Sequence, residues 1–389
     1  MEIIVEKKYC TGCGACVTIC SKSAISTYFD SEGFEYPIIN KDKCINCGLC
    51  QKICPPLNFQ NNLDDRKRNS NIQRGYAARN KNYNERYISS SGGIFPLLAR
   101  EVFKDNGVVV GVGYDSEFNA IYKIIESEKD LPLIQGSKYL QCKIDSSVFK
   151  SIKEILLTGR LVLFSGLACQ CEGLKGFLRK DYDNLICIDL ICMGVPSPII
   201  WQYYLQTYFA GEHVKKVNFK DKTVGWNSFN LAIETDKQNF CQHGADNPYF
   251  KSMFKTYNMR PSCFNCKFKS RERISDITLA DCWGVSDIEP LIDDNKGLSA
   301  VLIHSSRGEF IWERIKTKVD YVERPFEVFV KGNPNLVQVR TMDERSRRRF
   351  YSFIENMEYN NAFEFASSND ITYKSIIRRI ISKIIKGVK

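Results

Sequence analysis

CTGCGACVTIC at residues 10–20 and CINCGLCQKICP at residues 44–55 decide the fold of the first part of this chain. Both runs have the spacing C-x2-C-x2-C-x3-C, and the second repeats the first 34 residues later, from Cys10 to Cys44. Three cysteines on a tight loop can reach three irons of a compact iron–sulfur cube, and the fourth cysteine of each run ligates the other cube. The two runs therefore predict a pair of [4Fe–4S] clusters.

The exchange of fourth cysteines assigns one ligand set to each cluster. The first cluster takes Cys10, Cys13, Cys16 and Cys54, and the second takes Cys44, Cys47, Cys50 and Cys20. Two zinc sites are the alternative, but zinc favours C-x2-C pairs that are well separated in sequence. Four cysteines within the eleven residues 10–20 fit a bacterial two-cluster ferredoxin module better.

The composition favours a metal-binding protein of a reducing compartment. The chain has 389 residues, enough for two or three domains, with 17 cysteines and three histidines. Its start, MEIIVEKKYC, lacks the basic and apolar regions of a secretory signal, and no apolar run is long enough to span a membrane. Many cysteines without an export signal favour metal ligation in the cytoplasm over a disulfide framework.

The positive charge is concentrated at the end of the chain. The net charge is +10, yet residues 1–60 balance, whereas residues 371–389 hold six basic and no acidic side chains. This distribution argues against a general nucleic-acid surface. In residues 371–389, isoleucines at helical spacing alternate with Lys and Arg, which predicts peripheral contact with the inner face of a membrane. Docking of this tail on the protein's own body or on a partner subunit is the alternative.

The order of predicted elements indicates an α+β or α/β protein in five segments. We expect a two-cluster ferredoxin module at 1–58, with strands at residues 2–6 and 36–39, and a polar linker at 59–73. A mixed α/β module follows in two parts, 74–160 and 161–350, and a helical tail ends the chain at 351–389.

A run of small residues opens a predicted helix in the α/β module. Residues 89–95 read SSSGGIF and pass into an apolar helical pattern that continues to Phe103. Backbone N–H groups at such a helix start suit an anion such as a flavin phosphate. A plain helix cap is the alternative interpretation. The nearby Gly111-Val112-Gly113 lacks the third glycine of a dinucleotide-binding fingerprint.

Four later cysteines form a candidate third metal site: Cys169, Cys192, Cys263 and Cys266. Cys169 and Cys192 follow consecutive predicted strands, whose ends meet at one edge of a parallel sheet. The other two form a C-x2-C pair. Buried free cysteines and a zinc-binding C-x2-C are the alternatives. We interpret Cys142, Cys171, Cys187, Cys241 and Cys282 as core or incidental cysteines.

These stretches together resemble the coenzyme F-420 hydrogenase/dehydrogenase beta-subunit family, preceded by the ferredoxin module. The matching segments are SSSGGIF (89–95), GSKYLQC (136–142), FSGLACQCEGLKGFL (164–178), DLICMGVPSP (189–198), RPSCFNCKF (260–268) and DITLADCWG (276–284). The resemblance spans residues 74 to about 350. It implies a flavin-binding α/β module that holds FAD beside a [4Fe–4S] cluster.

The resemblance also implies roles for individual residues. Ser91, Gly92 and Gly93 would line the flavin, and Lys138, Tyr139 and Gln141 would contact flavin or substrate. Asp281, Trp283 and Gly284 would shape the same pocket, and Cys169, Cys192, Cys263 and Cys266 would hold the cluster. Met193 stands where the family often has His, so the deazaflavin coenzyme is not assumed as substrate.

Two functions follow from these expectations. The first is an iron–sulfur flavoprotein oxidoreductase that passes electrons between ferredoxin-type clusters and a flavin. Its substrate would be a small or glycan-related molecule, in keeping with family members that accompany bacterial polysaccharide biosynthesis, and a redox partner protein would exchange electrons with it. The second is an electron-relay subunit of a larger redox complex without its own substrate site. A structural zinc protein is a third, remote interpretation.

Overall fold

The computed structural model describes residues 3–59, 73–284 and 292–368. Its N-terminal module contains α1 (Ala15–Ile19), β1 (Ile25–Phe29), β2 (Glu35–Ile39) and α2 (Leu49–Lys52). The strands β1 and β2 form an antiparallel hairpin in which Ile25 pairs with Ile39. The prediction of a strand at residues 2–6 is wrong for its described part, because the chain turns there and the amides of Tyr9 and Cys10 donate to the Glu6 carbonyl.

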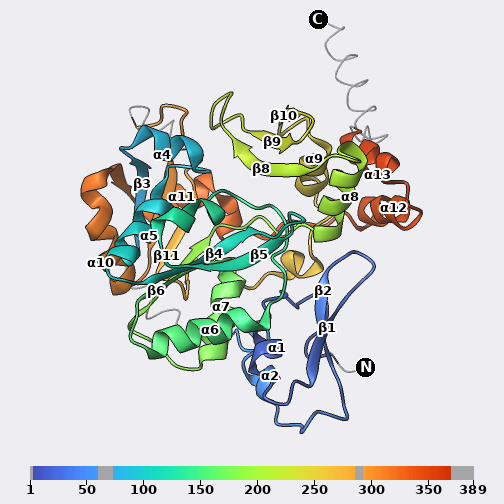
Figure 1. Cartoon of the computed structure of the whole chain (residues 1–389), viewed down its shortest axis with the longest axis horizontal. Coiled ribbons are helices and arrows are strands. Elements are labelled where there is room, and N and C mark those ends of the chain that lie inside the picture. The colour runs from blue at the N-terminus through green and yellow to red at the C-terminus, as the bar shows by residue number, and fades with distance from the viewer. Residues whose placement is uncertain (1–2, 60–72, 285–291, 369–389) are drawn as a thin grey trace, which may run out of the picture.

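A mixed eight-stranded sheet forms the centre of the molecule (Figure 1), in the order β13-β3-β12-β11-β7-β6-β4-β5. In chain order its strands are β3 (Arg74–Asn80), β4 (Val108–Tyr114), β5 (Ala120–Ile125), β6 (Val162–Ser165), β7 (Leu185–Leu190), β11 (Ile277–Asp281), β12 (Ser299–Ile303) and β13 (Val319–Arg324). The inner strands β4, β6, β7 and β11 are parallel, and antiparallel strands complete both edges. Segments 74–160 and 161–350 thus contribute strands to one sheet.

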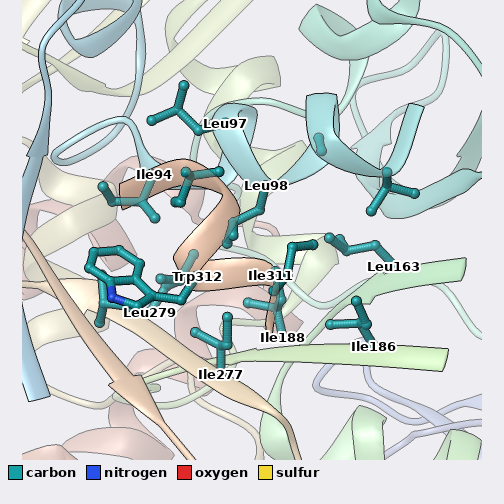
Figure 2. Close-up of a cluster of buried hydrophobic side chains, with 14 of the residues drawn as sticks. Ile94, Leu97, Leu98, Leu163, Ile186, Ile188, Ile277, Leu279, Ile311 and Trp312 are labelled. Carbon is teal, nitrogen blue, oxygen red and sulfur yellow. The ribbon is translucent and has the colours of Figure 1, made fainter. Parts of the chain in front are cut away.

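Helices cover both faces of this sheet because its inner strands are apolar on both sides. On one face, α5 (Ile94–Lys104) and α10 (Ser306–Ile315) pack on strand residues such as Leu163 and Ile188. Figure 2 shows Leu98 of α5 and Ile311 of α10 above the strands in this core. On the other face, α6 (Ser146–Leu157) and α7 (Ala168–Leu178) form a second core with Val110.

The N-terminal module is attached to this second face. Helix α1 packs against both α6 and α7, and Ala15 and Ile53 of the module belong to the same buried cluster as Phe149 of α6. The cysteine runs therefore lie beside the helix that carries Cys169.

A smaller antiparallel sheet and several helices build a third body beside the central sheet (Figure 1). Its elements are α8 (Pro198–Tyr208), β8 (Val214–Asp221), β9 (Asn230–Thr235), β10 (Asn239–His243), α9 (Pro248–Phe254), α12 (Glu344–Glu355) and α13 (Tyr359–Ser367). Its core is rich in aromatic rings, including Trp201, Phe219 and Tyr249, which contact one another.

Short elements connect these bodies. They are α4 (Tyr83–Ile88), η1 (Glu128–Leu133), η2 (Pro261–Asn265), η3 (Lys316–Lys318), α11 (Phe326–Gly332) and η4 (Pro334–Leu336). The predicted basic tail at 371–389 and nearly all of the linker at 59–73 lie outside the described residues. Within the described ranges, no helix combines the length and apolar character needed to cross a membrane.

Candidate metal centres and active site

Two half-modules with matching backbone geometry carry the N-terminal cysteine runs. Gly14 precedes α1 with φ 81°, and Gly48 precedes α2 with φ 67°. This left-handed conformation favours glycine, and it lets each chain turn from its cysteine loop directly into a helix. The repeat seen in the sequence is therefore a repeat in structure.

The predicted ligands of the first cluster, the first set, line one cavity: Cys10, Cys13, Cys16 and Cys54. Burial raises the pKa of the Cys16 thiol well above its usual value, and the neighbouring thiolates of Cys13, Cys10 and Cys54 raise it further. The structure thus brings Cys54 to the first run, although it lies 34 residues after Cys20. Four thiolates this close repel one another unless a cationic group lies between them.

The predicted ligands of the second cluster, the second set, lie at the surface end of the module: Cys44, Cys47, Cys50 and Cys20. Burial raises the pKa of Cys50, and the nearby Cys47 and Cys44 thiolates add to this shift. Cys20 and Cys50 pack in one small cluster with Cys16 and Cys54. Cys47 is exposed, so this set reaches solvent, whereas Cys10 and Cys54 of the first set are buried.

The four later cysteines, the third set, are half-buried and line a single cavity: Cys169, Cys192, Cys263 and Cys266. Cys169 lies in the first turn of α7, Cys192 follows β7, and the other two belong to η2 and its end. Burial raises the pKa of Cys169 well above its usual value, and the thiolates of Cys266, Cys192, Cys263 and Cys13 add to the shift. The appearance of Cys13 among these neighbours shows that the first and third sets are adjacent.

Within the described parts of the chain, no group of three or more His, Cys, Asp or Glu side chains could hold a single metal ion, whereas a [4Fe–4S] cube is held by four separate thiolates around its larger body. The assignment of the three sets to clusters therefore rests on the spacing of the cysteines and on the cavities that they share.

Two basic side chains line the cavity of the third set. The Lys269 ammonium donates to the Cys192 carbonyl at 2.8 Å, and burial lowers the pKa of this lysine. Arg273, which is 4% exposed, donates to the buried carboxylate of Asp189 at 3.2 Å. These cations would offset the negative charge of four thiolates, so the residues present fit an iron–sulfur cluster.

Helix α7 and Arg260 join the first and third sets. A β-carbon on Gly173 of α7 would lie 2.9 Å from the Cys13 sulfur, so the helix backbone approaches this cysteine closely. The Arg260 side chain is 1% exposed and donates to the Cys10 carbonyl at 2.7 Å and to the Cys10 sulfur at 3.6 Å. Its own carbonyl accepts from the Cys263 amide at 2.9 Å. One residue thus contacts both cysteine sets.

A cavity with a volume of about 310 Å³, the central pocket, lies beside the third set. Its wall includes residues 89–91, 134–140, 165–167 and 190–196 and the end of β11. Residues 165–167, residues 190–196 and the end of β11 lie at the carboxyl ends of the parallel strands β6, β7 and β11, where α/β sheets commonly bind ligands. The volume lies within the range of small-molecule and cofactor sites.

The predicted flavin-side residues divide into two groups. The structure places Ser91, Gly93, Lys138, Tyr139 and Asp281 in the wall of the central pocket. The other four lie outside its lining: Gly92, Gln141, Trp283 and Gly284.

Each of three outlying residues has another contact. The Gln141 side chain accepts from Arg260 at 2.7 Å, beside the first cysteine set. Trp283 stacks on Trp226 with ring centroids 4.5 Å apart. Gly92 packs against the backbone of β3, because a β-carbon there would lie 2.4 Å from the Ala78 carbonyl.

Three lysines lie at or beside the pocket: Lys220 and Lys222 are buried and Lys138 is half-buried. Lys138 donates to the carbonyls of Gln135 and Gly136, and burial lowers its pKa to about 7. Lys222 donates to the Ser91 carbonyl at 2.7 Å, and burial lowers its pKa to about 7 as well. Lys220 pairs with Asp281 at 3.0 Å.

Sequence reasoning did not single out Arg260, Lys220 or Lys222. Arg260 stands in the quoted segment 260–268, but nothing in the sequence shows that its side chain crosses to Cys10. Lys220 lies near the end of β8 and Lys222 just past it, so their spacing of two residues puts both on one face of the strand. This spacing is the signal from which the sequence could have identified them.

Comparison with known proteins adds the family context. Residues 159–327 match a family model that describes the C terminus of the coenzyme F420 hydrogenase/dehydrogenase beta subunit, and residues 9–57 match a 4Fe-4S dicluster domain. No curated protein matches the chain. Among solved structures, the F420-reducing [NiFe] hydrogenase complex from Methanosarcina barkeri contains a similar chain, at 17% identity and a TM-score of 0.44. That similarity covers 75% of this chain and 89% of the other.

Proposed function

We propose that the chain is a flavin-dependent iron–sulfur oxidoreductase, because residues 159–327 match the coenzyme F420 hydrogenase/dehydrogenase beta-subunit family model and residues 9–57 match a 4Fe-4S dicluster domain. In this proposal the central pocket holds the flavin, as FAD, and admits a small-molecule substrate. The third cysteine set holds a third [4Fe–4S] cluster. A glycan-related substrate, expected from the family resemblance, stays a prediction.

One observation carries the proposal: Cys192 lines both the central pocket and the cavity of the third set. Leu167, Leu190, Gly194 and Val195 line both as well. The predicted flavin site and the predicted third cluster would thus share a wall. A cysteine set that only stabilised the fold would have no need to adjoin a cavity of this size.

The start of α5 supports flavin binding at one end of the pocket. Gly93 is the N-cap residue and has no side chain to accept from the first helical N–H groups. These amides would be available to a flavin phosphate. The Ser90 hydroxyl accepts from the Ser137 amide at 2.7 Å, and Lys222 holds the Ser91 carbonyl, so the loops around this helix start are fixed.

The protein's own contribution is to hold the carriers in line and to keep water away from them. A bound flavin would supply the exchange between one-electron and two-electron chemistry. The three cysteine sets extend from exposed Cys47 through buried Cys10 to Cys192 at the pocket wall. Lys138, with its pKa near 7, can hold a proton or a positive charge beside a ligand in the pocket.

Quantification of iron, sulfide and flavin in anaerobically purified protein tests this proposal. We expect about twelve irons and one flavin per chain, because three [4Fe–4S] clusters contain about four irons each. About eight irons without flavin would overturn the proposal and favour the electron-relay subunit. Zinc in place of iron would exclude both functions.

A further inference from the structure

We propose that the surface around loop 44–50 docks an acidic protein that carries single electrons, such as a flavodoxin. This inference rests on the proposed function, because it assumes that electrons enter or leave through the dicluster module. It goes further by assigning the docking face and the charge of the partner.

The lysines of the module differ in their surroundings. Lys7 pairs with Asp30 at 3.5 Å and Lys8 with Glu6 at 2.8 Å. The other four lysines of residues 3–59 are exposed: Lys22, Lys41, Lys43 and Lys52. Among the salt bridges between described residues, none includes any of these four. Each lies within three residues of a predicted ligand of the second cluster.

The carboxylates of the module are used elsewhere. Glu32 pairs with Arg347 of α12, in the third body. Glu35 accepts from the Ile144 amide at 2.9 Å, and Asp30 accepts from the backbone of its own hairpin turn. Asp42 is the one acidic residue in the segment 40–52. The charges of the module balance in the sequence. In the structure, however, the lysines that form no salt bridge with a described residue gather around the second set.

The fold brings the four lysines to one end of the module. The Asn40 amide donates to the Ala24 carbonyl at 2.8 Å, so the turn that bears Lys22 lies next to the turn that bears Lys41 and Lys43. Lys52 ends α2, which packs against α1. Figure 1 shows α2 near the lower edge of the molecule, away from the small sheet of β8, β9 and β10.

An apolar contact and a predicted cluster ligand lie among these charges. Ile45 is 61% exposed, and Cys47 is exposed beside it. An exposed apolar residue within a ring of like charges suits a short-lived complex, because the charges steer the partner and little area is buried. The positive sign of the ring selects an acidic partner.

The test measures binding of an acidic flavodoxin to the full-length, cluster-loaded protein. Isothermal titration calorimetry at low ionic strength gives the affinity for oxidised flavodoxin. Stopped-flow spectroscopy gives the rate at which flavodoxin hydroquinone anion loses one electron to the dicluster module, a step in which no proton moves. We expect both to fall with added salt.

The variant K41E/K43E should weaken binding and slow electron transfer by about tenfold or more at low salt. The matched control is K215E/K216E, which makes the same charge change on exposed residues of β8. The control should stay within about twofold of the wild type. Iron content and reduction by dithionite should be unchanged in both variants.

Equal losses in the two variants would overturn the docking surface, as would an unchanged K41E/K43E protein or a wild type that binds no flavodoxin. None of these results affects the flavin content or the iron count that test the proposed function. A protein with about twelve irons and a flavin but no flavodoxin response would therefore refute this inference alone.

Discussion

The second and third cysteine sets have opposite environments. The second set reaches solvent at Cys47 among unpaired lysines, and its neighbour Ile45 is exposed. The four cysteines of the third set are half-buried and line one cavity, with Lys269 and Arg273 at its wall and the central pocket behind Cys192. An exposed site can exchange electrons with another protein, whereas an enclosed site keeps water away from a neighbouring reaction. In the proposed function, the second set would meet a partner protein and the third set would lie beside the substrate.

The largest expected effect comes from removing one cysteine of the third set or one cysteine of the second set. C263A should lose about four of about twelve irons and leave the dicluster module intact, and C47A should lose about four irons from the second site. Iron analysis and the spectrum of the reduced protein distinguish the two losses. C241A, a change at an exposed cysteine outside the three sets, is the control and should keep all iron. Full iron in C263A would remove Cys263 from the ligands.

The next prediction concerns the buried cation at the first set. R260Q removes the charged donor to the Cys10 sulfur, and such a donor stabilises the more negative, reduced state. We expect the reduction potential of one cluster to fall by about 60 mV, the equivalent of tenfold in a one-electron equilibrium constant. A redox titration monitored by electron paramagnetic resonance measures this reduction potential.

R347Q is the control for this effect. Arg347 is 5% exposed and lies on α12 of the third body, where it contacts Glu32 of the N-terminal module and the Met259 carbonyl, so its charge serves the junction between the module and the third body. We expect R347Q to lower the melting temperature, as R260Q should, but to leave the reduction potentials of all clusters unchanged. A shift of potential in both variants would show that Arg260 acts only through the fold.

A smaller effect is expected at the enclosed end from Lys138. Its pKa is near 7 because of burial, so its charge is lost as the pH rises through about 7. An anionic ligand such as FAD should therefore bind more weakly above pH 7 than below it, by up to about tenfold, or about 1.4 kcal/mol. Flavin fluorescence on release measures this change.

K138M should abolish the pH dependence with weak binding throughout, and K138R should abolish it with tight binding throughout, because arginine stays charged. If FAD binding to K138M had the same pH dependence as in the wild type, Lys138 would be excluded as the group responsible.

The smallest expected effect comes from replacing the glycine that precedes the helix in each half-module. Both Gly14 and Gly48 have positive φ, so alanine at either costs about 1 kcal/mol in backbone strain. A β-carbon at Gly14 would also lie 3.1 Å from the Ile144 side chain, whereas a β-carbon at Gly48 would meet no described atom within 4 Å. G48A should lower the melting temperature by about 2 °C and G14A by more. Equal shifts would contradict the enclosed position of the first set.

Much of the fold followed from local patterns. The buried strands at 108–114, 162–165 and 185–190 have apolar runs, and helices follow the second and third of them, so the α/β character was predictable. The cysteine spacing likewise indicated which ligands belong together. The prediction of a strand at residues 2–6 was wrong for its described part, because so short an apolar segment does not specify whether the chain pairs with another strand or forms a turn.

The site was less predictable. Gln141 and Trp283 stand in motif segments, yet their side chains contact Arg260 and Trp226 rather than the central pocket. Nothing in a linear motif shows to which side each side chain turns once the segment leaves a regular strand. Arg260 was not predicted for the same reason, since its partner Cys10 is 250 residues away.

The sequence by itself determined the chemistry of the dicluster module, because thiolate spacing on a tight loop is a local property. It also determined the alternation of strands and helices, which depends on neighbouring residues. Only the tertiary structure decided that the second set faces solvent among unpaired lysines and that the third set adjoins the pocket. Those properties depend on which distant segments pack together, and the packing of α1 on α6 and α7 sets them here.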